Sequence, residues 1–302
     1  MLPVEPSVFK NMIGITKDDL IEADVAGFVF ATPTGTISSK KLVESIQFER
    51  DTNLGFVEQQ QTWLKHAKQR LQQKIQATGN AELILVGSLP FDNRDLPEMS
   101  IAEAKNTYVT EGLDLTEPLE RLSQVQVTLI PPQADYVDGV AKLVALMKST
   151  ELEKAVLARA IDLHSEQKIQ IEELFYQLFK TNPEGYTFAF AQDPKEQGWF
   201  MGASPELLVA KQNQFVFSNP VAGTLARCAD VAEDQEQAQR LLASAKDQHE
   251  HAVVIEAIAD QLSPLCESLS IPKSPSLIKT STVWHLATPI QGTLKDPEMH
   301  VF

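Results

Sequence analysis

Hydrophobic and polar positions in the first third of the chain alternate between strand-like and helix-like patterns. Residues 26–37 (AGFVFATPTGTI) predict two strands joined by a turn that contains proline and glycine. Residues 56–77 are rich in Gln, Lys and Leu, and their apolar spacing predicts an amphipathic helix. Residues 81–90 (AELILVGSLP) form a short apolar run that ends in glycine and proline, so we expect a buried strand there.

The middle of the chain carries a second helical pattern. It opens with Pro131, Pro132 and Asp135, after which apolar residues recur at three- and four-residue steps. Residues 154–163 (KAVLARAIDL) are apolar and partly β-branched, which predicts a strand. Residues 171–180 predict a short amphipathic helix.

The second half of the chain predicts strands in clusters. Short strand-like pieces separated by turn residues indicate an antiparallel meander at 186–191, 199–201, 207–211 and 214–218. One long helix is expected over residues 233–262, and residues 277–294 return to strand character. Because helices stand between the strand clusters and not after every strand, we expect an α+β fold with mainly antiparallel sheets.

Composition and charge limit the possible partners. The chain has 302 residues, 43% hydrophobic and 22% charged, which is typical of a globular protein with one large domain or two small ones. The formal net charge of −15 repels nucleic acid and anionic lipid, so we expect neither as a partner. An anionic substrate would need local cations or a bound metal. No glycine-rich phosphate loop occurs in the sequence, so nucleotide chemistry has no support.

The sequence gives no sign of a membrane span or a secretion signal. No apolar run reaches the roughly 18 residues that a span needs. The first residues, MLPVEPSVFKNMIG, lack an apolar core behind basic residues. We therefore expect a soluble cytoplasmic protein.

Glu206 is a candidate general acid. It follows Ser204 and Pro205 in MGASPELLV, just before an apolar strand. An apolar setting raises the pKa of a carboxyl group and keeps a proton available for donation. A turn with a solvated glutamate explains the same residues, and the pattern leaves both interpretations open.

Glu250 is a candidate metal ligand on the predicted long helix. Steps of four residues place it on one stripe with Leu242, Lys246, Val254 and Ile258. A carboxylate on such a stripe is paired, protonated or metal-bound, and an ion pair with Lys246 is the structural alternative. A lone carboxylate with partners from elsewhere suits Mg²⁺ better than zinc.

Zinc chemistry has little support. His249 and His251 stand two residues apart, so on a helix they face different directions and make poor joint ligands. Cys228 and Cys266 have no CxxC or Cys/His ligand spacing around them. We expect both cysteines to be free thiols.

Two further candidates have a structural alternative as well. Gly223 lets a substrate approach the backbone, and Thr224 offers a hydroxyl and an N–H, but the pair also suits an ordinary turn. Lys154 directly precedes the mostly apolar run AVLARAI. A lysine in an apolar strand can act as a base, although it can equally extend its charge to the strand's edge.

In this order the motifs resemble the chorismate-binding enzyme family, which includes anthranilate, aminodeoxychorismate, salicylate and isochorismate synthases. The matching stretches are KAVLAR, FMGASPELLV, SNPVAGTLAR, LLASAKDQHEH and VWHLATPIQG, which cover residues 150–292; LVGSLPFD earlier in the chain is also similar. The resemblance implies an α+β chorismate-binding fold with two facing antiparallel sheet layers and outer helices. It implies one domain over residues 1–302, with 1–130 less characteristic and 131–302 bearing the motifs.

Three positions favour the isochorismate synthase branch of that family. Aminodeoxychorismate synthases carry a nucleophilic lysine just before the Gly-Thr pair, where this chain has Ala222. Isochorismate and salicylate synthases carry a lysine at the position of Lys154, and ammonia-using anthranilate synthases do not. WHLATP around His285 is most similar to isochorismate synthases of catechol-siderophore pathways.

The resemblance implies a Mg²⁺-dependent isomerase that converts chorismate to isochorismate. Lys154 would take a proton from the water that attacks C2, and Glu206 would protonate the hydroxyl that leaves C4. A base and an acid in separate environments is the arrangement that such chemistry needs. The other implied site residues are Gly223, Thr224 and His285 against the substrate and Glu250 as a Mg²⁺ ligand.

Related enzymes continue well beyond the position that matches the end of this chain. We therefore expect a C-terminally truncated sequence that lacks a second metal-binding glutamate and the cationic residues for substrate carboxylates. A salicylate synthase or another chorismate-using enzyme, an inactive fragment and a non-catalytic chorismate-binding protein remain as alternatives. By the same resemblance we expect a monomer.

Overall fold

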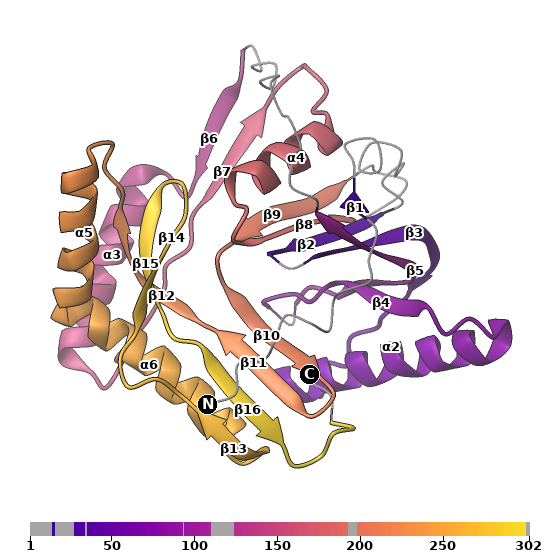
Figure 1. The fold of residues 1–302 in the computed structure, drawn as a ribbon. Helices are drawn as coiled ribbons and strands as arrows, with labels where there is room; N and C mark the ends of the chain where they lie inside the picture. Colours follow the sequence, from indigo (N-terminus) through magenta and orange to yellow (C-terminus); the bar gives the residue numbers. More distant parts are fainter. Residues whose placement is uncertain are drawn as a thin grey trace. The chain divides into compact units, whose positions relative to one another are not determined.

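The elements form two compact units (Figure 1). The structure is a computed structural model that describes residues 14–15, 27–33, 35–92, 94–109, 124–192 and 198–299. The first unit holds the described residues up to 109 together with 171–192 and 198–205, and the second holds 124–170 and 206–299. The sequence interpretations of the N-terminal stretch and of the last residues fall on positions 1–13 and 300–302, which lie outside the described residues. A single domain over residues 1–302 stays a prediction.

The first unit is built on a seven-stranded sheet. Its strand order is β1-β5-β3-β2-β8-β9, with β4 paired to β5 outside this path. Every pair in this sheet is antiparallel except β1 with β5. The strands are β1 Gly14–Ile15, β2 Phe28–Thr32, β3 Gly35–Ile46, β4 Leu83–Ser88, β5 Glu98–Val109, β8 Tyr186–Ala191 and β9 Trp199–Ser204.

Two helices of the described part of the chain pack against this sheet. The helix α2 (Phe56–Thr78) lies along β4 and buries Trp63 and Ala67 against strand residues such as Ile101. The helix α4 (Ile171–Thr181) packs on β8 and β9. In both helices the apolar positions recur at helical spacing, so one face is buried and the other meets water.

The second unit contains three smaller sheets. Their orders are β10-β11-β16-β13, β12-β15-β14 and β6-β7, and all their pairs are antiparallel. The strands are β6 Gln126–Ile130, β7 Ala160–His164, β10 Leu207–Gln212, β11 Phe215–Asn219, β12 Val221–Ala226, β13 Cys266–Ser270, β14 Ser276–Lys279, β15 Val283–Ala287 and β16 Ile290–Leu294.

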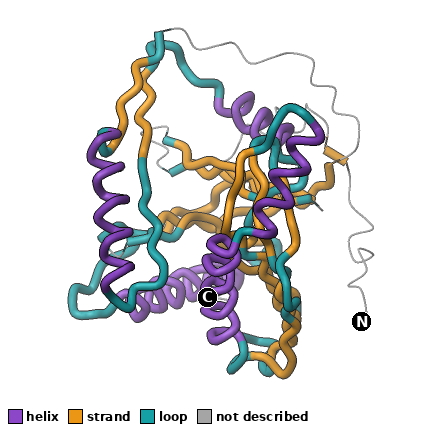
Figure 2. The backbone as a smooth tube through the Cα atoms, turned by 90° about the vertical axis from the view of Figure 1, so that its left-hand side faces the viewer, coloured by secondary structure: helices purple, strands orange, loops and turns teal. Residues whose placement is uncertain are grey.

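Of the helices that the structure describes, three accompany these sheets. The helices α5 (Val231–Ala243) and α6 (Ala245–Leu262) both pack on β12 and β15, where Leu241, Trp284 and Leu286 form the core. The helix α3 (Gln133–Ser149) follows β6. Figure 2 shows α3 beside the irregular segment that leads into β7, and Arg159 of that segment stacks over the ring of Tyr136.

The structure confirms most of the predicted elements. The α+β class with antiparallel sheets is correct, as are the helices near 56–77, after Pro132 and near 171–180. The strands expected within 26–37, 81–90 and 277–294 are present among the described residues. Of the helices that the structure describes, none is long and apolar enough to cross a membrane.

The strands expected at 186–191, 199–201, 207–211 and 214–218 are present, but their grouping into one meander is wrong, and the strand expected at 154–163 is only partly present. The strand expected at 154–163 begins only at Ala160, and residues 152–159 have no regular structure. The reason is pairing, because β6 is the one partner of β7 among the described strands and their ladder ends at Ile130 opposite Ala160. The expected meander is also split: β8–β9 belong to the seven-stranded sheet and β10–β11 to a different one, with Pro205 between them.

The predicted long helix is two helices. Ser244 separates α5 from α6 with an extended backbone (φ −72°, ψ 107°), and its hydroxyl accepts a hydrogen bond from the N–H of Asp247. A serine in this position caps the second helix. The expected stripe is therefore wrong at Leu242, which lies on α5, while Lys246 and Glu250 share α6.

Candidate active site

Gly223 is the extra residue of a β-bulge. Between β12 and β15, Ala222 lies opposite Leu286 and Thr224 opposite His285, so Gly223 has no partner in the ladder. Its φ is +78°, a conformation that L side chains rarely adopt. A Cβ at this position would also lie 3.1 Å from the Cβ of Asp247 on α6. Both the bulge and the close approach of α6 therefore require glycine here.

The bulge brings Thr224 and His285 together. The Thr224 hydroxyl and Nδ1 of His285 form a hydrogen bond of 2.9 Å. His285 is half-buried, and this burial lowers the pKa of its imidazole, against smaller opposing effects of the Gly223 backbone and the Glu206 charge. The neutral ring is therefore favoured, and its nitrogens can then donate or accept a hydrogen bond.

Glu206 lies near the same strand. Its Oε1 accepts a hydrogen bond of 3.2 Å from the N–H of Val221 at the start of β12. The side chain is exposed, which agrees with the solvated-turn interpretation of its surroundings and not with an apolar one. Its role as a general acid stays a prediction.

Lys154 and Glu250 form an ion pair across 96 positions of sequence. The Nζ of Lys154 lies 3.1 Å from Oε1 of Glu250, and the two side chains are 23% and 30% exposed. Lys154 reaches this position from the irregular segment before β7, not from a strand. The structure thus brings the predicted base and the predicted metal ligand together.

A second lysine bonds the other oxygen of Glu250. The Nζ of Lys246 lies 2.7 Å from Oε2 of Glu250 and 3.1 Å from Oδ1 of Asp247. The bond from Lys246, followed by that from Lys154, lowers the pKa of Glu250, while partial burial opposes the shift. The pairing between positions 246 and 250 that the helical spacing suggested is confirmed.

His251 is a buried residue that sequence reasoning did not single out for a structural role. It is 2% exposed, and its Nε2 forms a 2.7 Å hydrogen bond with the hydroxyl of Thr288, which follows β15. Burial is the main cause that lowers its pKa, and the charge of Lys154 adds to the shift. His251 ties α6 to the end of β15, whereas His249 points elsewhere, so the two do not act as a ligand pair.

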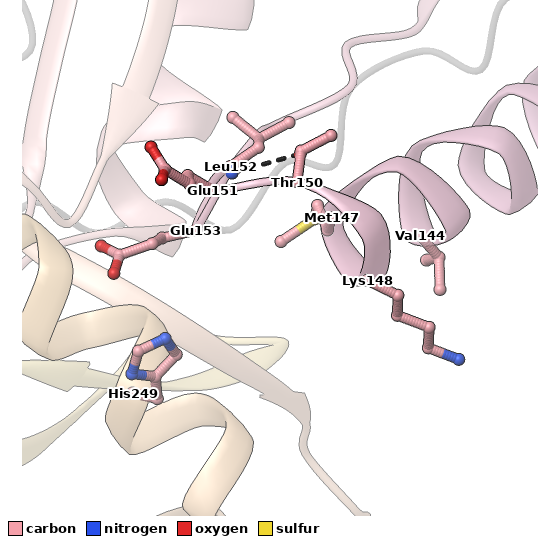
Figure 3. A pocket seen from close by; sticks show the side chains of 8 residues that line it. All are labelled: Val144, Met147, Lys148, Thr150, Glu151, Leu152, Glu153 and His249. Carbon is pink, nitrogen blue, oxygen red and sulfur yellow. Dashed lines mark hydrogen bonds between the residues drawn. The ribbon is translucent and has the colours of Figure 1, made fainter.

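An open pocket of about 870 Å³ lies where α3 ends and α6 begins (Figure 3). Its lining residues are Val144, Met147, Lys148, Thr150, Glu151, Leu152, Glu153 and His249. Glu153 precedes Lys154 in the chain and His249 precedes Glu250. The pocket therefore adjoins the segment and the helix turn that carry the ion pair.

Asp247 and Glu250 each place one carboxylate oxygen beside the same cation, the ammonium of Lys246. They lie three residues apart on α6. Mg²⁺ commonly takes one or two protein carboxylates and completes its shell with water and substrate oxygens. Within the described part of the chain, no group of three or more His, Cys, Asp or Glu converges on one metal position.

All six predicted site residues lie in the second unit, in two groups. One group is Glu206, Gly223, Thr224 and His285, and the other is Lys154 with Glu250. The helix α6 connects the groups, since Asp247 faces the bulge glycine and Glu250 follows three residues later. Lys246, Asp247 and His251 also lie in this part of the structure. In the sequence all three belong to the motif LLASAKDQHEH, which could have pointed to them.

Comparison with known proteins defines the class. A family model described as chorismate binding enzyme matches residues 99–302, and the chain belongs to that family. It is 35% identical to isochorismate synthase DhbC of Bacillus subtilis over 297 residues, 96% of this chain and 73% of the relative. It is 38% identical over 234 residues to the vibriobactin-specific isochorismate synthase of Vibrio cholerae, covering 77% of this chain and 58% of that protein.

The fold agrees with the same class. A crystal structure described as a 2,3-dihydroxybenzoate-specific isochorismate synthase, DhbC, from Bacillus anthracis superimposes with a TM-score of 0.82 at 34% identity. The match covers 94% of this chain and 73% of that one. The resemblance that the motifs indicated is confirmed at the level of the family and its fold.

Proposed function

We propose that this protein is an isochorismate synthase that isomerises chorismate to isochorismate for siderophore biosynthesis. The observation that carries the proposal is 35% identity to DhbC across 96% of the chain, together with Lys154 at the position of the lysine base. Ala222, buried beside the bulge, leaves no nucleophilic lysine for the aminodeoxychorismate reaction.

In this proposal Lys154 and Glu206 move the protons. Lys154 removes a proton from the water whose oxygen attacks C2 of chorismate, and Glu206 gives a proton to the hydroxyl that leaves C4 as water. The ring double bonds shift between these carbons, so the product is an isomer of the substrate. Over one turnover Lys154 therefore gains a proton and Glu206 loses one.

The other residues position the substrate. The bulge at Gly223 lets the substrate approach the backbone of β12, and the Thr224–His285 pair presents a hydroxyl and a ring at the same edge. Bound at Glu250 and Asp247, Mg²⁺ would supply positive charge opposite the ring carboxylate of chorismate. That charge matters because the protein carries a formal net charge of −15.

The test is turnover by the purified protein with chorismate and Mg²⁺, followed by chromatography of isochorismate, pyruvate and anthranilate. We expect isochorismate without pyruvate, and a loss of about 10²- to 10⁴-fold in kcat for Lys154→Met. Lys168→Met, which removes an equal charge from an exposed position, is the matched control and should retain activity. Anthranilate formed from ammonia would contradict the proposal.

A salicylate synthase is the second candidate, because Lys154 is common to both water-using branches. It would release pyruvate in the same assay, so the product mixture separates the two. The main proposal includes a cytoplasmic location and a monomeric state. Light scattering of the purified protein measures its mass and so tests the monomeric state.

A further inference from the structure

Lys246 occupies the space between two carboxylates that are less exposed than itself. The side chain of Lys246 is 75% exposed, whereas those of Asp247 and Glu250 are 16% and 30% exposed. Its Nζ contacts both of them, at 3.1 Å and 2.7 Å. The ammonium thus reaches in from solvent and offsets the repulsion between two nearby negative charges.

Both carboxylates have other contacts that hold them in place. The second oxygen of Asp247 accepts a hydrogen bond from the Ser244 hydroxyl, and the Asp247 N–H donates back to that hydroxyl. The second oxygen of Glu250 accepts from Lys154, which is only 23% exposed. Removing Lys246 would therefore leave the two carboxylates where they are.

Lys246 is also the more exposed of the two lysines that contact Glu250, at 75% against 23% for Lys154. Its charge sits at the end of a flexible four-carbon stem, and an ion pair with an exposed partner contributes little free energy. Release of the ammonium into water needs only a rotation of that stem. A divalent cation offers the carboxylates twice the charge in the same space.

We propose that Lys246 is a displaceable placeholder, whose ammonium holds the cation position between Asp247 and Glu250 until a divalent metal replaces it. The inference rests on the proposed function, because it names the regulation of that metal position. Lys246 then competes with the metal, and the metal-free site keeps its shape without a bound ion. A lysine that recruits or supports the metal would have the opposite effect on affinity.

The test is whether removal of the Lys246 charge raises or lowers the affinity of the protein for a divalent metal. Mn²⁺ binding to the purified protein is titrated by electron paramagnetic resonance of the free ion, without chorismate, for wild type, Lys246→Met, Lys168→Met and Glu250→Gln. We expect Lys246→Met to bind Mn²⁺ about fivefold more tightly than wild type. Lys168→Met removes the same charge from an exposed position outside the pair and should change the affinity far less.

The same titration separates the two possible failures. If Glu250→Gln binds Mn²⁺ as tightly as wild type, the proposed metal site is wrong. If binding depends on Glu250 but Lys246→Met binds with equal or lower affinity, the placeholder inference alone is overturned.

Discussion

Among the candidate site residues, Gly223 has the tightest backbone requirement, because its φ is positive. Its positive φ disfavours any side chain, and a Cβ would lie 3.1 Å from Asp247 Cβ on α6 and 3.3 Å from Leu286 Cδ1 on β15. The same bulge aligns Thr224 with His285. Glycine at position 223 is therefore needed both for the backbone conformation of the fold and for the alignment of Thr224 with His285.

We predict that Gly223→Ala lowers the free energy of unfolding by about 2 kcal/mol and reduces kcat/KM. Gly79→Ala is the matched control, because Gly79 also has a positive φ (69°) but nothing lies within 4 Å of its Cβ position. That control should lose only about 1 kcal/mol and keep its activity. Urea unfolding and steady-state kinetics measure both, and equal losses in the two variants would contradict the role of the α6 contact.

At the scale of elements, a buried carboxylate joins α5 to the end of β12 and to β15. Asp234 accepts hydrogen bonds from the Arg227 guanidinium at 2.8 and 3.1 Å, from Trp284 Nε1 at 2.9 Å and from the Cys228 N–H at 3.1 Å. Arg227 also lies over the Trp284 ring. Trp284 directly precedes His285, so this network sets the position of the strand that carries the site.

This network makes stability depend on acid pH. The Arg227 guanidinium, with help from Trp284 and Cys228, lowers the pKa of Asp234 from 3.8 to about 2. Since the folded pKa lies below the unfolded one, the stabilisation is fully present above about pH 4 and is lost as pH falls towards 2. We predict that the stability difference between wild type and Asp234→Asn is constant near neutral pH and shrinks below about pH 4.

Urea unfolding at several pH values measures that difference. Asp260→Asn, at an exposed position on α6, is the control and should unfold like wild type throughout. A difference for Asp234→Asn that stayed constant down to pH 2 would show that the charge of this carboxylate does not stabilise the junction.

Sequence pattern predicted the elements better than their pairing. The helix α2 begins where its spacing begins, because amphipathic periodicity is local. The strand β8 pairs with β2 and β11 with β16, partners far away in the chain, and nothing in the alternation of residues 186–218 distinguishes them. The break at Ser244 was likewise hidden, because the helical spacing continues on both sides of it.

The candidate site shows the same limit. Glu250 and Lys246 were paired by spacing, but the bond from Lys154 joins positions 96 residues apart and depends on the fold. Gly223, Thr224 and His285 were linked through family resemblance, and the register of β12 with β15 supplies the physical reason. His251 was considered only as a ligand, although its burial makes it part of the helix packing.

At the scale of the whole molecule, the net charge of −15 opposes the approach of an anionic substrate, while local cations attract it. The described site contributes Lys154 and Lys246, both engaged by carboxylates, so the long-range repulsion is not cancelled there. Salt screens distant charges over a Debye length of about 8–10 Å and weakens contacts within the site much less.

We therefore predict that kcat/KM for chorismate at saturating Mg²⁺ rises about twofold when KCl increases from about 0.02 to 0.2 M. At saturating chorismate, kcat should remain nearly constant, because approach no longer limits the rate. Initial rates at fixed free Mg²⁺ measure both constants. A fall in kcat/KM with salt would mean that cations near the site outweigh the field of the whole protein, and the acidic surface would then have no part in setting substrate affinity.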